Sequence, residues 1–200
     1  MPPDLRTRPP LGLRHGWMAD VVRRHTGGGR HYHTVQHVQE MLDAWTTQAW
    51  QHPVETWLAV VLHDAVYVVG AADNEERSAA LVAGWVDRFV GSPDDVDVPR
   101  VERLILETAR HGDHGALSED TARFVDCDMA ILAAEPARFA AYEDQVRREW
   151  VPVVGAEAYE RGRRAFFSGL VGRRIFQSAA FAAREAQAQA NLRGALASSG

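Results

Sequence analysis

Histidine side chains are concentrated in one short segment near the start of the chain. The segment RHYHTVQH, residues 30–37, holds three of the nine histidines. His33 and His37 are four residues apart, so on a helix their rings would lie on one face, one turn apart. Two imidazoles placed in this way can reach a single point. The segment is not the zinc-protease motif, because Thr34 stands where that motif requires a glutamate.

Three carboxylates lie in apolar segments, where an unpaired charge is unfavourable. His63 and Asp64 interrupt the run VVLHDAVY, and Asp126 and Asp128 flank the single cysteine in FVDCDMAIL. A buried charge without a partner destabilises a fold by several kcal/mol, and a divalent cation would supply the compensating charge. Two imidazoles and two carboxylates form a mixed shell that suits Mn, Fe, Co, Ni, Zn or Mg and leaves positions for water and substrate.

The elements that must position these residues are predicted to be helices. Apolar residues recur three and four positions apart in six segments, which are HTVQHVQEMLDAW, VETWLAVVLHDAV, NEERSAALVAGWVDRFV, VERLILETA, SEDTARFVDCDMAIL and ARFAAYEDQVRREW. Stretches rich in glycine, proline or small polar residues separate these segments. The sequence therefore predicts an all-α fold, a bundle of about seven to nine helices.

Length, charge and cysteine content limit the class of protein. A chain of 200 residues that is 46% hydrophobic favours one domain, which we expect over residues 11–200 after a proline-rich flexible leader at 1–10. A net charge of −5, without any lysine, argues against a large nucleic acid as partner. The single cysteine and the lack of a long apolar run favour a cytoplasmic protein without signal peptide or membrane anchor.

The order of the motifs resembles that of the HD-domain superfamily of metal-dependent phosphohydrolases. Its signature is a histidine, an adjacent His-Asp pair and a distant aspartate, all carried by helices. The segments RHYHTVQHV, LHDAVY, DNEERSA and DCDMAIL are similar to the motifs of a bacterial branch of predicted HD phosphohydrolases, over roughly residues 15–192. The resemblance implies an HD-type helical domain whose metal ligands are His37, His63, Asp64 and Asp128.

The resemblance also implies catalytic and accessory roles. We expect His33 and Asp64 to be catalytic, because His33 matches the histidine that protonates the leaving group in the cyclic-nucleotide phosphodiesterases of the superfamily. Thr34 replaces the asparagine of that motif. Residues that we expect to support the ligands or to bind a second metal are His111, Asp126, Glu75 and Glu76. The phosphate-binding candidates are Arg30 and Arg110, followed by Arg147 and Arg148.

The expected function is hydrolysis of a phosphate ester of a small nucleotide-like metabolite by a metal-activated water. The segment HDAVYVVG lacks the glutamate of the nucleotidase branch and the histidine of the phosphodiesterases, so both a phosphomonoesterase and a phosphodiesterase stay open. Two other functions also stay open. One is an HD fold that binds a nucleotide or a partner without turnover, and the other is a di-iron helical protein that uses oxygen.

Overall fold

The computed structural model describes residues 5–110 and 114–198. By its internal contacts the chain divides into two compact units, Met1–Arg110 and His111–Gly200. Regular structure in the described ranges is helical, apart from one isolated bridge between Leu13 and Val90. The all-α prediction is therefore confirmed. The prediction of a single domain over 11–200 stays a prediction.

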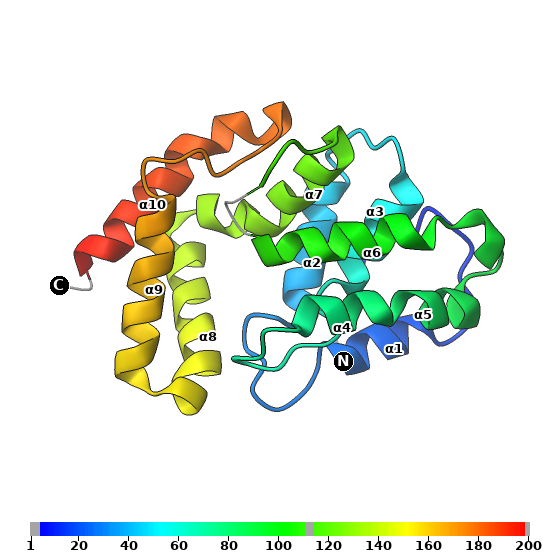
Figure 1. Cartoon of the computed structure of the whole chain (residues 1–200), viewed down its shortest axis with the longest axis horizontal. Helices are drawn as coiled ribbons and strands as arrows, with labels where there is room; N and C mark the ends of the chain where they lie inside the picture. The colour runs from blue at the N-terminus through cyan, green and yellow to red at the C-terminus, as the bar shows by residue number, and fades with distance from the viewer. Residues whose placement is uncertain (1–4, 111–113, 199–200) are drawn as a thin grey trace. The chain divides into compact units, whose positions relative to one another are not determined.

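The first unit is built on one buried helix. Its α-helices are α1 (Trp17–Arg24), α2 (Val35–Trp45), α3 (Pro53–Leu62), α4 (Asn74–Ala80), α5 (Val82–Phe89) and α6 (Val98–Glu107), with 3-10 turns at Pro93–Asp95 and Thr108–Arg110. Every side chain of α3 from Glu55 to Leu62 is buried, as expected for a helix that is apolar on most of its surface. Helices α2 and α6 pack against α3, and α6 also packs against α4 and α5 (Figure 1).

Two helix ends position the histidines. Thr34 caps α2, where its hydroxyl accepts a hydrogen bond from the Gln36 main-chain N–H at 3.3 Å. His37 therefore lies in the first turn of α2, whereas His33 precedes the cap and lies outside the helix. This corrects the expectation that both rings extend from one helix face. At the end of α3, His63 is the C-cap, so the His63–Asp64 pair comes directly after the buried residues of that helix.

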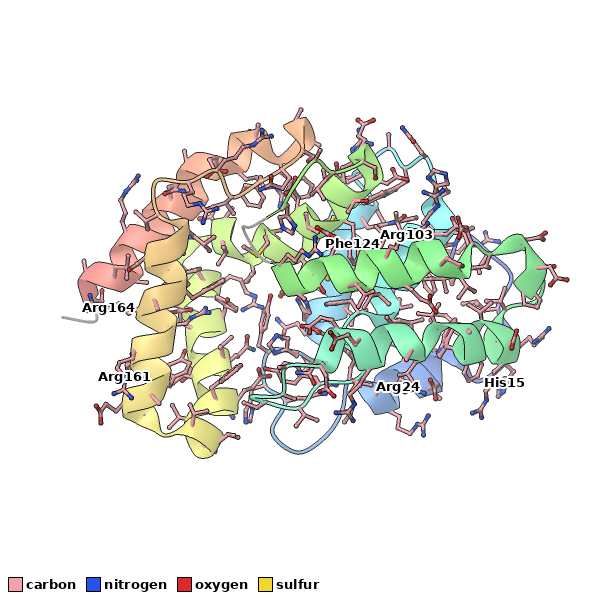
Figure 2. The ribbon with its side chains drawn as sticks, viewed as in Figure 1. His15, Arg24, Arg103, Phe124, Arg161 and Arg164 are labelled. Atoms are coloured by element: carbon pink, nitrogen blue, oxygen red, sulfur yellow. The ribbon has the colours of Figure 1, made fainter. Side chains whose placement is uncertain are left out.

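The second unit contains an antiparallel helix pair. Its elements are α7 (Glu119–Met129), a 3-10 turn at Ala130–Ala133, α8 (Pro136–Val154), α9 (Ala156–Leu170), a 3-10 turn at Ala179–Arg184 and α10 (Glu185–Ser198). Helices α8 and α9 lie side by side (Figure 1) and are joined at Gly155, whose φ of 82° favours glycine. Phe124 on α7 is fully buried, whereas Arg161 and Arg164 on α9 are exposed (Figure 2).

One helical pattern is divided in the structure. The continuous apolar pattern over 74–90 forms two helices, α4 and α5, which meet at Leu81. Within the expected leader at 1–10, Leu5 is buried, and the main-chain N–H of Arg6 donates to Gln39 at 2.7 Å. The flexible leader stays a prediction.

Within the two described ranges, no helix combines the length and the apolar character that crossing a bilayer requires.

Candidate metal centre

Two histidine rings meet inside the first unit. His37 and His63 are each 2% exposed, and their Nε2 atoms lie 3.1 Å apart. The rings come from the first turn of α2 and the end of α3, two helices that pack against each other. Both rings offer nitrogen atoms that could hold a metal ion. The sequence-based prediction that they share one site is therefore supported by their positions.

The protonation of His63 follows from its hydrogen bond. Its Nδ1 lies 2.9 Å from the carbonyl oxygen of Val60, and a carbonyl only accepts, so Nδ1 carries a proton. In the neutral ring the Nε2 atom then presents a lone pair. The His63 Nε2 atom lies 3.1 Å from the Asp64 Oδ2 atom and 3.1 Å from the His37 Nε2 atom. The distance between His37 Nε2 and Asp64 Oδ2 is 3.7 Å.

These three donor atoms fit a divalent cation. If His63 also carried a proton on Nε2, that proton could form a hydrogen bond to only one of the two neighbouring atoms. A divalent cation at this place would contact all three donor atoms at once. Ligand atoms about 2.1 Å from a metal, at tetrahedral or octahedral angles, stand about 3.0 to 3.4 Å apart. The two distances of 3.1 Å fall in this range, and 3.7 Å requires a small adjustment of Asp64.

The electrostatics favour the ionised form of Asp64. Burial raises the pKa of this carboxyl group, but the neighbouring imidazoles of His63, His33 and His37 more than offset that effect. The pKa is therefore held well below its usual range. A carboxylate that stays ionised is available as a metal ligand at any pH near neutrality.

His33 lies beside the cluster, stacked on an aromatic side chain. The centroid of its half-buried ring is 4.0 Å from that of Tyr67, with 25° between the ring planes. The centroid of the His37 ring is 6.0 Å away. His33 is thus adjacent to the candidate ligands without joining the group formed by His37, His63 and Asp64. This position is compatible with the predicted role of a proton donor.

Arg30 makes two main-chain contacts at the same place. Its Nη1 donates to the carbonyl oxygen of His33 at 2.7 Å, and its Nη2 donates to the carbonyl oxygen of Asp64 at 2.9 Å. Its guanidinium also lies over the ring of Tyr67, 5.2 Å from the centroid. These contacts could not be predicted from the residue types, because every residue carries a main-chain carbonyl.

The segment DNEERSA contributes two structural side chains. The Asn74 amide exchanges hydrogen bonds with the main-chain N–H and carbonyl of Val68, and the Ser78 hydroxyl does the same with Val66. The predicted supporting residues of this segment lie in the first turn of α4, where Glu75 is half-buried and Glu76 is exposed.

The two aspartates of the last motif lie in the second unit, on α7. Asp126 is fully buried, and its carboxylate accepts hydrogen bonds from the main-chain N–H of Gln177 at 2.6 Å and from the N–H and hydroxyl of Ser178. Burial raises the pKa of Asp126, against the effect of these bonds. Asp126 thus fixes a distant segment, while Asp128 is half-buried and remains the predicted ligand.

Four further candidate residues lie on other elements or outside the described residues. His111 lies outside the described residues. Arg110 is exposed and lies 3.9 Å from Glu107. Arg147 and Arg148 are exposed on α8, where they pair with Glu160 at 3.4 Å and with Asp144 at 3.8 Å. The phosphate-binding roles of these arginines, and that of Arg30, stay predictions.

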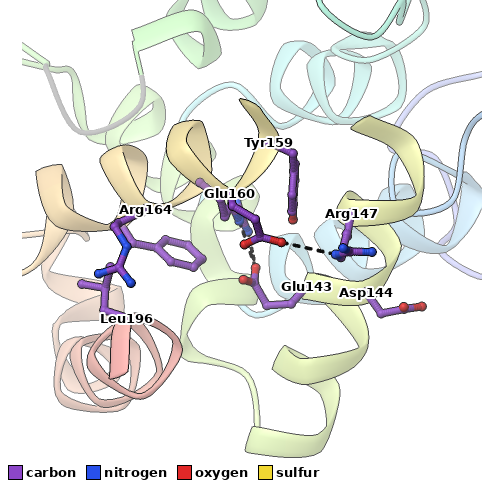
Figure 3. Close-up of a pocket in the computed structure, with 9 residues that line it drawn as sticks. Glu143, Asp144, Arg147, Tyr159, Glu160, Arg164 and Leu196 are labelled. Atoms are coloured by element: carbon purple, nitrogen blue, oxygen red, sulfur yellow. Dashed lines mark hydrogen bonds and ion pairs between the residues drawn. The ribbon is translucent and has the colours of Figure 1, made fainter. Parts of the chain in front are cut away.

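A pocket of about 240 Å³ lies in the second unit between α8, α9 and α10 (Figure 3). Its lining carries equal numbers of acidic and arginine side chains, and two acid–arginine pairs form within it. Glu160 points toward Arg147, and Glu143 pairs with Arg163 (Figure 3). None of the predicted metal ligands lines the pocket, and its lining has no excess of one charge.

Sequence analysis missed the burial of His25. The ring is 1% exposed, and its Nδ1 donates to the Val21 carbonyl at 2.9 Å. Its Nε2 has no hydrogen-bond partner among the described residues. Burial lowers the pKa of His25 to about 4. A histidine at the C-cap of a short helix carries no sequence signal for such burial.

Comparisons of the chain with protein-family models, with curated proteins and with solved structures find no match.

Proposed function

We propose that this chain is a metal-dependent phosphohydrolase. The observation that supports this proposal is the convergence of His37 Nε2, His63 Nε2 and Asp64 Oδ2, in which one imidazole lone pair faces two other donor atoms at 3.1 Å. The order of the motifs, which resembles that of the HD-domain superfamily, supports the reaction class. The sequence further predicts that Asp128 supplies a fourth ligand.

His37, His63 and Asp64 would hold a divalent cation, which would lower the pKa of bound water from 15.7 to as low as about 7 and polarise a phosphoryl oxygen. The chain's own residues have separate tasks. His63 is held in one tautomer by the Val60 carbonyl, which keeps its Nε2 available as a ligand. Asp64 supplies a carboxylate oxygen, 3.1 Å from this Nε2 atom, as the anionic ligand.

His33 is the proposed proton donor to the leaving oxygen. Its ring is half-buried, lies next to the ligand His37 and is oriented by stacking on Tyr67. General acid catalysis by a positioned imidazole contributes about 100- to 10,000-fold to a rate. The proposed substrate is a small phosphate ester, because an acidic chain with a net charge of −5 is poorly suited to a long polyanion.

The proposal is tested on the full chain after removal of bound metal by a chelator. Mn, Fe, Co, Ni, Zn and Mg are added singly, bound metal is measured by mass spectrometry, and hydrolysis of p-nitrophenyl phosphate, bis(p-nitrophenyl) phosphate and a nucleotide panel is followed. We expect metal binding and hydrolysis together. The Asp64→Asn variant should lose both, whereas the control Asp73→Asn, which changes an exposed carboxylate of the same unit, should keep both.

Other outcomes point to other functions. A chain that binds no divalent ion would overturn the proposal. Metal binding without hydrolysis of any phosphate ester would instead favour an HD-type fold that binds a ligand without turnover. Two bound irons with an absorbance that changes under oxygen would favour the di-iron alternative.

A further inference from the structure

We propose that Arg30 is a positioning residue that fixes the proton donor His33 relative to the metal ligand Asp64. This inference rests on the proposed function. One guanidinium joins two residues that are 31 positions apart, because its Nη1 donates to the His33 carbonyl at 2.7 Å and its Nη2 to the Asp64 carbonyl at 2.9 Å. The two residues with the proposed catalytic roles are thus tied at their main chains by a single side chain.

The chemistry of arginine suits this task. A guanidinium is planar and always charged, and it presents its N–H groups in a fixed fork, so two acceptors bound to its two Nη atoms are held at a set spacing. A lysine ammonium keeps the charge but has a flexible stem and no planar fork. A lysine at position 30 would therefore fail to hold both carbonyls in the same geometry.

The aromatic ring of Tyr67 completes the arrangement. The Arg30 guanidinium lies over this ring at 5.2 Å, and the imidazole of His33 stacks on it at 4.0 Å. His33 is thus restrained twice, at its carbonyl by Arg30 and at its ring by Tyr67. Its orientation is set before any substrate binds.

Tyr67 is itself held by α4. Its neighbours Val66 and Val68 are each bound through both main-chain polar groups, at distances of 3.0 and 3.2 Å to the Ser78 hydroxyl and 2.9 and 3.0 Å to the Asn74 amide. Asn74 and Ser78 are buried, so water competes little with these bonds. The segment that carries Tyr67 is therefore fixed on both sides.

A positioning role and a phosphate-clamp role make opposite kinetic predictions for Arg30→Lys. If Arg30 orients His33, the lysine variant loses kcat on the order of 100-fold, because a displacement near 1 Å has that effect, while KM changes little. If Arg30 binds the substrate phosphate, the retained positive charge preserves kcat and the variant chiefly raises KM. The matched control is Arg24→Lys, which changes another part-buried arginine of the same unit, one that pairs with Asp20.

A second measurement does not depend on metal or turnover. In the metal-free chain, the ring current of Tyr67 should shift the His33 ring protons upfield in the NMR spectrum, with the signal assigned through a His33→Gln variant. We expect Arg30→Lys to move this signal downfield and Arg24→Lys to leave it in place. If Arg30→Lys does not fold, Arg30→Gln serves instead, since glutamine presents one donor nitrogen in place of the two Nη atoms that span the two carbonyls.

Failure of this inference is distinguishable from failure of the proposed function. An unchanged His33 signal in the Arg30 variant overturns the positioning role, whether or not the chain hydrolyses phosphate esters. A rise in KM without a loss of kcat overturns it as well. If the wild-type chain binds no metal while the signal moves as expected, the proposed function fails and the tie between His33 and Asp64 through Arg30 stands.

Discussion

The imidazole of His33 and the phenol of Tyr67 are stacked with 4.0 Å between their centroids, although the two residues are 34 positions apart in the sequence. The contact joins the segment before α2 to the segment after α3. These segments directly adjoin the first turn of α2, which carries His37, and the C-cap of α3, which is His63. The orientation of the proposed proton donor is therefore coupled to the positions of the ligands.

Substitution of Tyr67 should affect turnover through this stacking. Tyr67→Phe keeps an aromatic face for His33, so we expect kcat to change by less than about threefold. Tyr67→Leu removes the face and should lower kcat by about 10- to 100-fold, with metal binding unchanged. Steady-state kinetics and metal titration of both variants check this prediction. Equal activity of the leucine and wild-type chains would show that the stacking does not orient His33.

Removal of the proposed proton donor should act on the leaving group. In His33→Gln the metal ligands remain, so metal should bind as in the wild-type chain. The loss in kcat should be about 100-fold or more for an alkyl phosphate and smaller for p-nitrophenyl phosphate, whose leaving group departs without a proton. A loss of equal size for both substrates would contradict the assignment of His33 as the acid.

His25 predicts a pH dependence of stability. Burial lowers its pKa to about 4 in the folded chain, against an ordinary value of 6.5. Between these values the unfolded chain binds a proton that the folded chain does not, so this contribution to stability is present above pH 6.5 and lost as the pH falls toward 4. The shift corresponds to about 3 kcal/mol of unfolding free energy.

Urea unfolding of the metal-free chain at several pH values measures this effect. The difference between wild type and His25→Gln isolates it, because the two chains share every other ionisable group. We expect the unfolding free energy of the wild-type chain to fall more steeply below pH 6.5 than that of the variant. Parallel curves would show that His25 takes up its proton equally in both states.

Much of this arrangement was accessible from the sequence. The three and four spacing of apolar residues predicts helices, and the all-α fold is confirmed. A histidine and an aspartate in an otherwise apolar helix stand out because their burial requires a partner. That reasoning led to His63 and Asp64, and the geometry brings their side chains together with His37.

Other features could not be predicted, because they depend on partners distant in the chain. The contacts of Arg30 are with carbonyl oxygens, which every residue carries. Asp126 and Asp128 have nearly identical sequence neighbours, and the side chain of Asp126 is distinguished by bonds to Gln177 and Ser178, about 50 positions away. Only the tertiary structure distinguishes the hydrogen-bonded Asp126 from the half-buried Asp128.

The two aspartates of α7 should therefore differ when each is changed to asparagine. Asp126 accepts bonds from two main-chain N–H groups and one hydroxyl, and an asparagine would place an amide NH₂ against donors. We expect Asp126→Asn to lower the unfolding free energy by about 3 kcal/mol. Asp128 is half-buried and is the ligand predicted from the sequence, so Asp128→Asn should change stability little and weaken metal binding about tenfold or more.

Thermal unfolding of the metal-free variants and metal titration of the same preparations measure the two effects separately. The metal-free state is needed because a bound ion stabilises the folded chain and would mix the two readouts. A large loss of stability in Asp128→Asn with unchanged metal affinity would assign Asp128 a structural role. Weakened metal binding in a fully stable Asp126→Asn chain would make Asp126 the ligand instead, since a carboxylate engaged by Gln177 and Ser178 would then have to exchange those bonds for the cation.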